Sequence, residues 1–61
     1  MRRPPKIRQK VYDRWWGWWG HGVVIKALKT RWHIRFPQRG DLRERVLVYD
    51  RAHLQFLEPA K

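Results

Sequence analysis

Trp15, Trp16, Trp18 and Trp19 stand within five consecutive positions of a 61-residue chain whose formal net charge is +10. A core this small has no room for four neighbouring indoles, so we expect about two of them to plug the interior and two to face solvent. An exposed indole stacks on nucleobases, and each stacked base contributes about 1 to 3 kcal/mol with little sequence preference. The candidate stacking residues are Trp16, Trp18 and Trp19.

Cationic side chains supply the second candidate chemistry, which is phosphate binding. Arg31, His33 and Arg35 alternate with apolar residues, so in a strand they project from one face about 7 Å apart, comparable to successive phosphates. A solvated outer face is the alternative. However, residues 13–61 carry ten basic against five acidic residues, whereas a merely soluble surface mixes signs more evenly. The further cationic candidates are Lys26, Lys29 and Arg45 on neighbouring strands and Arg2, Arg3, Lys6 and Arg8 near the N-terminus.

The sequence offers no pattern for catalysis or for a metal. His21, His33 and His53 are 12 and 20 residues apart and have no cysteine among them, so we expect no zinc site. The five acidic residues are scattered, and serine and cysteine, the usual nucleophiles, do not occur. We therefore predict a binding protein without a cofactor and not an enzyme.

The tryptophans also allow an aromatic cage for a methylated lysine or arginine, which binds by cation–π attraction. Such cages commonly include an acidic residue, and Asp13 is the only one near the cluster. The net charge opposes this alternative, because a basic protein repels a basic tail.

Length and composition predict one domain with a thin core. The lack of cysteine favours a reducing compartment, and we expect an intracellular, cytoplasmic protein. No apolar run approaches 18 residues, so neither a membrane span nor a secretory signal is expected.

Residues 1–9 hold two prolines and four basic residues, which predicts a flexible basic arm or, alternatively, a solvated terminus. The domain then covers residues 10–61.

From Lys10 onward the apolar residues recur with a period of two, which predicts an all-β fold. We expect strands over 10–16, 21–29, 31–36, 44–49 and 54–57. Within 44–49, Val46 and Val48 fall on one face and Leu47 and Tyr49 on the other. Asp50 is a good N-cap, so one 3₁₀ turn is expected before the last strand.

We expect these five short strands, joined by tight hairpins, to close into a small barrel, because closure leaves no exposed sheet edge. The order of parts resembles the Src-homology-3-like barrels of the KOW and Tudor-like type over residues 10–58. The matching segments are Lys10–Asp13, Gly20–Val24, His33–Phe36 and Tyr49–Glu58. Such modules serve as RNA-binding and ribosomal elements, as polymerase-binding parts of transcription factors, as appendages of repair helicases, and as readers of methylated residues. The resemblance therefore implies binding and leaves the ligand open.

Charge and indole exposure together favour binding of DNA or RNA with low sequence specificity. The alternative is a protein-interaction module that docks on an acidic partner of the transcription, replication or repair machinery, with the tryptophans as hot spots. Adsorption to a membrane surface is disfavoured, because no amphipathic helix is encoded. A structural subunit of a larger assembly and the oligomeric state stay open.

Overall fold

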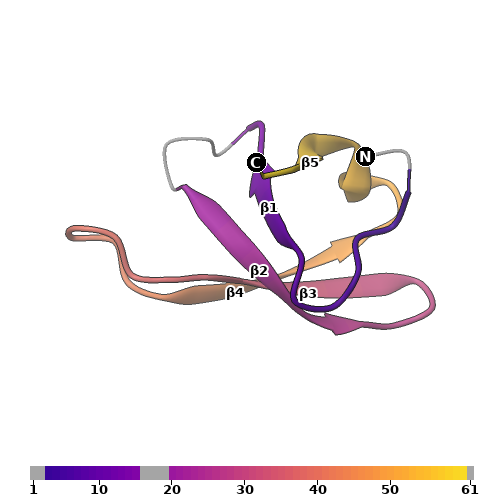
Figure 1. Cartoon of the computed structure of the whole chain (residues 1–61), viewed down its shortest axis with the longest axis horizontal. Helices are drawn as coiled ribbons and strands as arrows, with labels where there is room; N and C mark the ends of the chain where they lie inside the picture. The colour runs from indigo at the N-terminus through magenta and orange to yellow at the C-terminus, as the bar shows by residue number, and fades with distance from the viewer. Residues whose placement is uncertain (1–2, 16–19, 61) are drawn as a thin grey trace.

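The computed structural model describes residues 3–15 and 20–60. It confirms an all-β fold of five antiparallel strands (Figure 1). A single 3₁₀ turn precedes the last strand, as predicted. The elements are β1 (Lys10–Asp13), β2 (His21–Ala27), β3 (Arg31–Phe36), β4 (Arg45–Asp50), η2 (His53–Phe56) and β5 (Leu57–Pro59).

The strands form one sheet in the order β4-β3-β2-β1-β5. The first and last strands therefore lie side by side, with Val11 opposite Pro59 and Asp13 opposite Leu57. The sheet folds over on itself, and η2 packs against both end strands, β4 and β5. The β3–β4 hairpin projects beyond the rest of the molecule, at the left of Figure 1.

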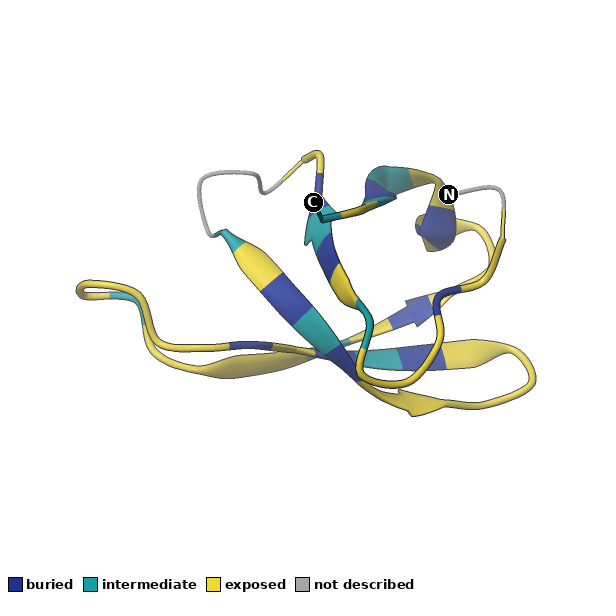
Figure 2. Cartoon of the chain, in the orientation of Figure 1, coloured by how far each residue is buried: buried dark blue, intermediate teal, exposed yellow. Residues whose placement is uncertain are grey.

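The core lies on the enclosed side of this sheet (Figure 2). The predicted inward set on β3 is confirmed, because Trp32, Ile34 and Phe36 are all buried. On β4 the prediction also holds, since Tyr49 is buried while Val46 and Val48 are about half exposed. The complete buried apolar set is Val11, Val24, Trp32, Ile34, Phe36, Tyr49, Leu54 and Leu57.

Gly22 allows β2 to cross this core closely. A Cβ atom at Gly22 would stand 2.8 Å from Ile34 Cγ2 and 2.9 Å from Phe36 Cε1, both in the packed interior. Gly40, at the tip of the β3–β4 hairpin, has a φ of 58°, a conformation that glycine adopts without steric cost. The two glycines thus serve different purposes, close packing and a turn.

β2 ends at Ala27 instead of residue 29, and β4 covers Arg45–Asp50 instead of 44–49. Two other boundaries differ more from the prediction. β1 ends at Asp13 instead of Trp16, because the Trp15 N–H donates to Asp13 Oδ1 at 2.7 Å and turns the chain out of the strand. Residues 53–56, assigned in part to the last strand, form η2, and the strand begins at Leu57. Leu54 and Leu57 are both buried, and their spacing of three suits one turn of 3₁₀ helix. Asp50 was predicted as the N-cap, but the N-cap residue of η2 is Ala52. Asp50 Oδ1 still accepts from the His53 N–H at 3.0 Å, just before the turn.

The segment predicted as an arm contacts β2 in its described part. Arg8 N–H donates to the Val24 carbonyl at 2.7 Å, and Val24 N–H donates to the Gln9 carbonyl at 3.0 Å. Gln9 N–H closes a turn on the Lys6 carbonyl, and Pro5 is buried. These contacts hold residues 5–9 against the sheet. The flexibility of the segment as a whole stays a prediction.

Candidate nucleic-acid interface

The face of the sheet opposite the core carries cationic side chains on three adjacent strands. The strand register sets them in rows. One row runs from Val46 through Arg35 and Val23 to Lys10, and the next contains Val48, His33 and Lys26. Arg31 follows on β3, opposite Asp50. The predicted stripe of Arg31, His33 and Arg35 therefore lies on one face, and we call this surface, with Lys10 and Lys26, the outer face.

The remaining cationic candidates fall elsewhere. Lys29 lies in the turn between β2 and β3, where Leu28 N–H donates to the Arg31 carbonyl. Arg45 pairs with Phe36, so its strand position belongs to the core side and does not extend the outer face. The prediction that Arg45 extends the stripe is therefore wrong, because the register could not be read without knowing where the hairpin turns. Arg3, Lys6 and Arg8 are exposed in the N-terminal segment, and Arg2 is outside the described residues.

Lys10 was missed as a member of the outer face. It pairs with Val23, whose other neighbour is Arg35, so it extends the row of Arg35 onto β1. Alternation along the sequence separates Lys10 and Tyr12 from Val11 and Asp13, but the neighbours of Lys10 on the next strands depend on the register.

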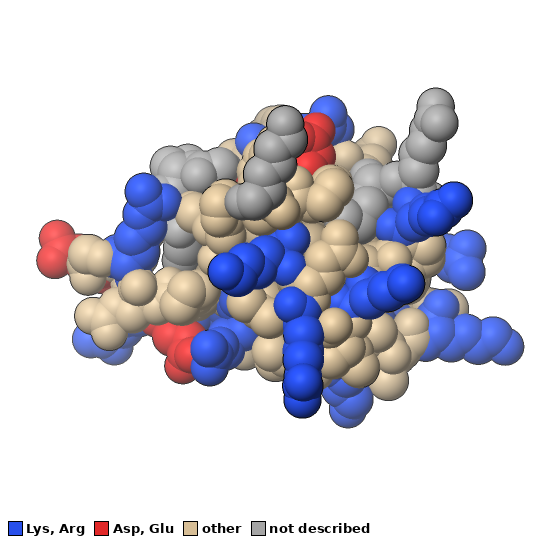
Figure 3. Space-filling view, in the orientation of Figure 1, with Lys and Arg blue, Asp and Glu red and all other residues tan. Residues whose placement is uncertain are grey.

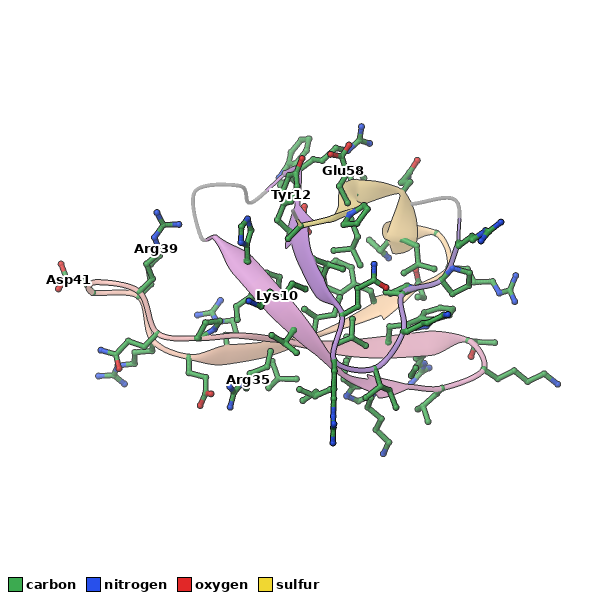
Figure 4. All side chains as sticks on the ribbon, viewed as in Figure 1. Lys10, Tyr12, Arg35, Arg39, Asp41 and Glu58 are labelled. Atoms are coloured by element: carbon green, nitrogen blue, oxygen red, sulfur yellow. The ribbon has the colours of Figure 1, made fainter. Side chains whose placement is uncertain are left out.

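Two acidic residues lie near these cations, Asp50 opposite Arg31 and Glu44 beside Arg35. Figure 3 shows Lys and Arg side chains spread over the face in view, with Asp and Glu towards its left part and upper edge. Arg35 Nη1 lies 3.3 Å from Glu44 Oε1, and both side chains are about half exposed, so this ion pair is weak and phosphate can compete for it. Arg35 reaches away from the side on which β1 and η2 lie, whereas Arg39 and Asp41 mark the far end of the hairpin (Figure 4).

The structure describes only one residue of the tryptophan cluster, Trp15. Trp16, Trp18 and Trp19 are outside the described residues, so their exposure stays a prediction. Trp15, which was not selected as a stacking residue, is 71% exposed. Its ring meets the Phe56 ring edge-on, with centroids 6.2 Å apart.

Trp15 forms one wall of a pocket that lies between β1, β4 and η2. The pocket has a volume of about 380 Å³. Its lining comprises Asp13, Trp15, Leu47, Val48, Tyr49, His53 and Phe56. No single sequence motif could have indicated it, because these residues come from three separate segments that only the fold brings together.

A hydrogen-bond network fixes the inner end of this pocket. The Tyr49 hydroxyl donates to Asp13 Oδ2 at 2.6 Å, while Asp13 Oδ1 accepts from Trp15 N–H. Burial first, and then the hydrogen bond and charge of Asp13, raise the pKa of Tyr49 far above its usual range, so the phenol keeps its proton. Asp13 is only 3% exposed. The network therefore holds Tyr49 and the start of the tryptophan segment in fixed positions.

The outer end of the pocket carries a second polar pair. His53 Nδ1 lies 2.6 Å from Asp50 Oδ1, and the hydrogen bonds from His53 lower the pKa of Asp50. The His53 ring also lies beside Phe56, with centroids 6.3 Å apart. His53 is thus oriented by a carboxylate on one side and an aromatic ring on the other.

A second hollow, of about 680 Å³, lies on the other side of η2. Arg14 and Arg51 line it together with Leu54 and Glu58. Arg14 is already engaged, since its Nη2 donates to the Gln55 carbonyl at 2.8 Å and its Nε lies 3.7 Å from Glu58 Oε1. Glu58 also accepts a hydrogen bond from the Tyr12 hydroxyl (Figure 4). Arg14 and Glu58, two of the charged residues that line this hollow, are thus paired with each other.

Among residues 3–15 and 20–60, no three His, Cys, Asp or Glu side chains gather as they would around a metal ion. The same residues contain no helix long and apolar enough to span a membrane. Comparison with known proteins gives no match to any family model, to any curated protein or to any solved structure.

Proposed function

We propose that this protein binds nucleic acid, with the outer face contacting phosphates and exposed indoles stacking on bases. The observation that carries the proposal is the placement of Lys10, Lys26, Arg31, His33 and Arg35 on one face across three strands. The low sequence specificity follows from the chemistry, because phosphate contacts carry no base information and every base has a face on which an indole can stack.

The net charge of +10 supports the same function. A strongly cationic protein attracts polyanions over distances of about a Debye length and accelerates their association. Trp15, 71% exposed beside the pocket, supports the stacking component. The five antiparallel strands and the 3₁₀ turn before the last strand agree with what a KOW or Tudor-like barrel implies, and we extend the proposal to that fold type.

The test is a titration of the protein with labelled single-stranded and double-stranded oligonucleotides at two salt concentrations, followed by fluorescence anisotropy. Binding to at least one form is expected, and the affinity should fall steeply with salt. Each phosphate contact contributes about −0.7 to the logarithmic slope for single strands and about −0.9 for duplex. A dissociation constant weaker than about 0.1 mM for both forms at low salt would reject the proposal, because non-specific binding alone reaches that range.

A specific observation also favours the second candidate, docking on an acidic protein of the nucleic-acid-processing machinery. Val46 and Val48 are 46% and 54% exposed on β4, an end strand of the sheet, and they lie beside Arg35 and His33. Apolar side chains flanked by cations suit a protein partner with acidic residues around an apolar centre. Capture of the same stoichiometric partner from nuclease-treated and untreated lysate would favour this function, since a protein partner survives removal of nucleic acid.

A further inference from the structure

The two end strands of the sheet, β5 and β4, differ in how they present their outer edges. β5 is three residues long and ends at Pro59, and both features hinder pairing with a further strand. β4 covers six residues, Arg45–Asp50, and pairs with β3 residue for residue without a bulge. Its other edge has no neighbouring strand among residues 3–15 and 20–60. β4 is therefore the end strand to which a further strand can add.

The backbone of β4 offers hydrogen bonds along this edge. Every second residue of an antiparallel strand exchanges hydrogen bonds with its partner, and the residues between direct their N–H and C=O groups away from it. Six residues extend over about 20 Å at about 3.4 Å each. A segment that adds to β4 satisfies these backbone groups, and its alternate side chains fall on the two faces of the sheet.

The pocket that Trp15 borders lies at the free edge of β4. Leu47 and Tyr49 project from one face of the strand and Val48 from the other, yet all three line the pocket. A cavity that touches both faces of a strand lies beside the edge of that strand. β3 is described in full and contributes no lining residue, so this is the edge away from β3. A side chain of an added strand therefore has the pocket within reach.

The accessible walls of the pocket are apolar. Trp15 and Val48 are exposed, and Phe56 is partly buried. Asp13 and Tyr49 are almost fully buried and are hydrogen-bonded to each other, so they form the floor and leave the contacts with a ligand to the apolar walls. A volume of about 380 Å³ has room for one large apolar side chain, such as phenylalanine. The pocket thus suits an apolar residue of the added strand.

Charge favours an acidic segment at this edge. The exposed Val46 and Val48 of β4 neighbour Arg35 and His33 on β3. A side chain of the added strand beside Val46 would lie two strands from Arg35, about 9.6 Å, a distance that the long side chains of arginine and glutamate bridge together. The net charge of +10 repels a basic segment and also a second copy of this chain.

We propose that the free edge of β4 pairs with an extended acidic segment of a partner protein. One large apolar side chain of the segment fills the pocket beside Trp15, and its acidic side chains lie over Val46 and Val48 on the outer face. The proposal rests on the second candidate function, docking on an acidic protein, and specifies both the segment that docks and its mode of binding.

The first test compares two capped, fluorescein-labelled heptapeptides by fluorescence anisotropy. In Glu-Val-Glu-Phe-Glu-Val-Glu the acidic and apolar side chains alternate, whereas Val-Val-Phe-Glu-Glu-Glu-Glu has the same composition and charge without the alternation. The dissociation constant of the alternating peptide should be at least about tenfold lower, because only this peptide directs its acidic and apolar side chains to opposite faces. Equal affinity for the two peptides shows that charge alone acts and overturns the proposal.

Variants of the protein locate the binding site. Val48→Glu places an acidic group at the exposed edge and should weaken binding of the alternating peptide at least about tenfold. Leu28→Glu makes the same change of charge at an exposed residue of the β2–β3 turn, and as the matched control it should weaken binding less than about threefold. Replacing the phenylalanine of the peptide by alanine should weaken binding about tenfold to the wild-type protein and much less to Trp15→Leu.

Two N-methylated peptides test the main-chain pairing with the wild-type protein. An added strand donates to β4 from every second N–H, so methylation of the phenylalanine nitrogen and of the next glutamate nitrogen should have unequal effects. One should weaken binding about tenfold and the other less than about threefold. Equal effects of the two methylations overturn the proposal, and so does undiminished binding to Val48→Glu. If circular dichroism shows that Val48→Glu is not folded, the methylated peptides decide.

The second candidate function is tested separately by capture of a stoichiometric partner from nuclease-treated lysate. Capture that persists undiminished with Val48→Glu supports that function and overturns β4 as its site. A protein dimer in sedimentation equilibrium that Val48→Glu dissociates would assign the edge to a second copy of this chain and overturn the proposal. Nucleic-acid binding is measured with oligonucleotides alone, so its failure is distinguishable from a failure at the β4 edge.

Discussion

Removing two cations from the outer face should lower the salt dependence of nucleic-acid binding by a defined amount. Lys26 of β2 and Arg31 of β3 are exposed at neighbouring positions of the outer face. Arg35 is a poorer choice, because Glu44 already compensates part of its charge. The variant Lys26→Gln/Arg31→Gln replaces both cations by a neutral polar side chain and lowers the net charge from +10 to +8.

The magnitude follows from counting contacts. If each of the two side chains neutralises one phosphate of a single strand, the logarithmic salt slope becomes shallower by about 1.4, which is two contacts at about 0.7 each. When the salt concentration rises fourfold, from 50 to 200 mM, the affinity of both proteins falls. The factor by which it falls should be about seven times larger for the wild-type protein than for the variant.

The assay is anisotropy of one labelled 12-mer of thymine at four salt concentrations. The control is Arg43→Gln/Arg51→Gln, which removes the same charge from the β3–β4 hairpin and from the turn after β4. This control should leave the slope within about 0.4 of the wild-type value, because these residues lie outside the outer face and only long-range attraction is reduced. If both double variants lower the slope equally, net charge and not the outer face governs binding, and the reasoning is refuted.

Three further predictions concern the stability of the fold. Gly22→Ala should lower the free energy of unfolding by about 1 to 3 kcal/mol, because the new methyl group meets the Phe36 ring at 2.9 Å. Gly40→Ala, in open space but with a φ of 58°, should cost only about 1 kcal/mol, and urea unfolding of both variants compares the two effects. Since the folded-state pKa of Tyr49 is raised above its usual value of 10.0, its contribution is complete below pH 10 and is lost as pH rises, by about 1.4 kcal/mol per pH unit. Urea midpoints measured from pH 9 to 11.5 should fall less steeply in Tyr49→Phe. The pKa of Asp50 is lowered below 3.8, so its contribution is present above that pH and is lost as pH falls, and acid unfolding should become less pH-dependent in Asp50→Asn.

The strands were predictable where apolar and polar residues alternate strictly. Arg31–Phe36 and the two faces of β4 follow directly from a period of two, since only one face of each strand is buried. The end of β1 was not predictable in this way. Trp15 continues the apolar pattern, but its backbone N–H donates to the Asp13 carboxylate and ends the strand. Local side chain to backbone bonds of this kind compete with strand pairing.

Most of the cationic residues of the candidate site were predictable from the sequence, but the pocket was not. The cationic stripe on β3 required only strand geometry, whereas the exclusion of Arg45 and the inclusion of Lys10 depend on the register between strands. The pocket depends on the packing of η2 against β4 and on the pairing of β1 with β5, whose partners, such as Asp13 and Leu57, are far apart in the sequence. Asp13 was considered only as a possible cage residue, although its buried carboxylate connects Tyr49 to the backbone of Trp15.

The neighbouring positions of the first and last strands have a consequence for biosynthesis. Asp13 cannot meet Leu57 until Leu57 itself has left the ribosome, so β1 has only one of its two ladders before that point. Until residues 53–56 are also available, Trp15 lacks the Phe56 ring that it contacts. A nascent polypeptide that stalls before residue 53 is therefore expected to expose apolar surface of β1 and to need chaperone protection or rapid degradation.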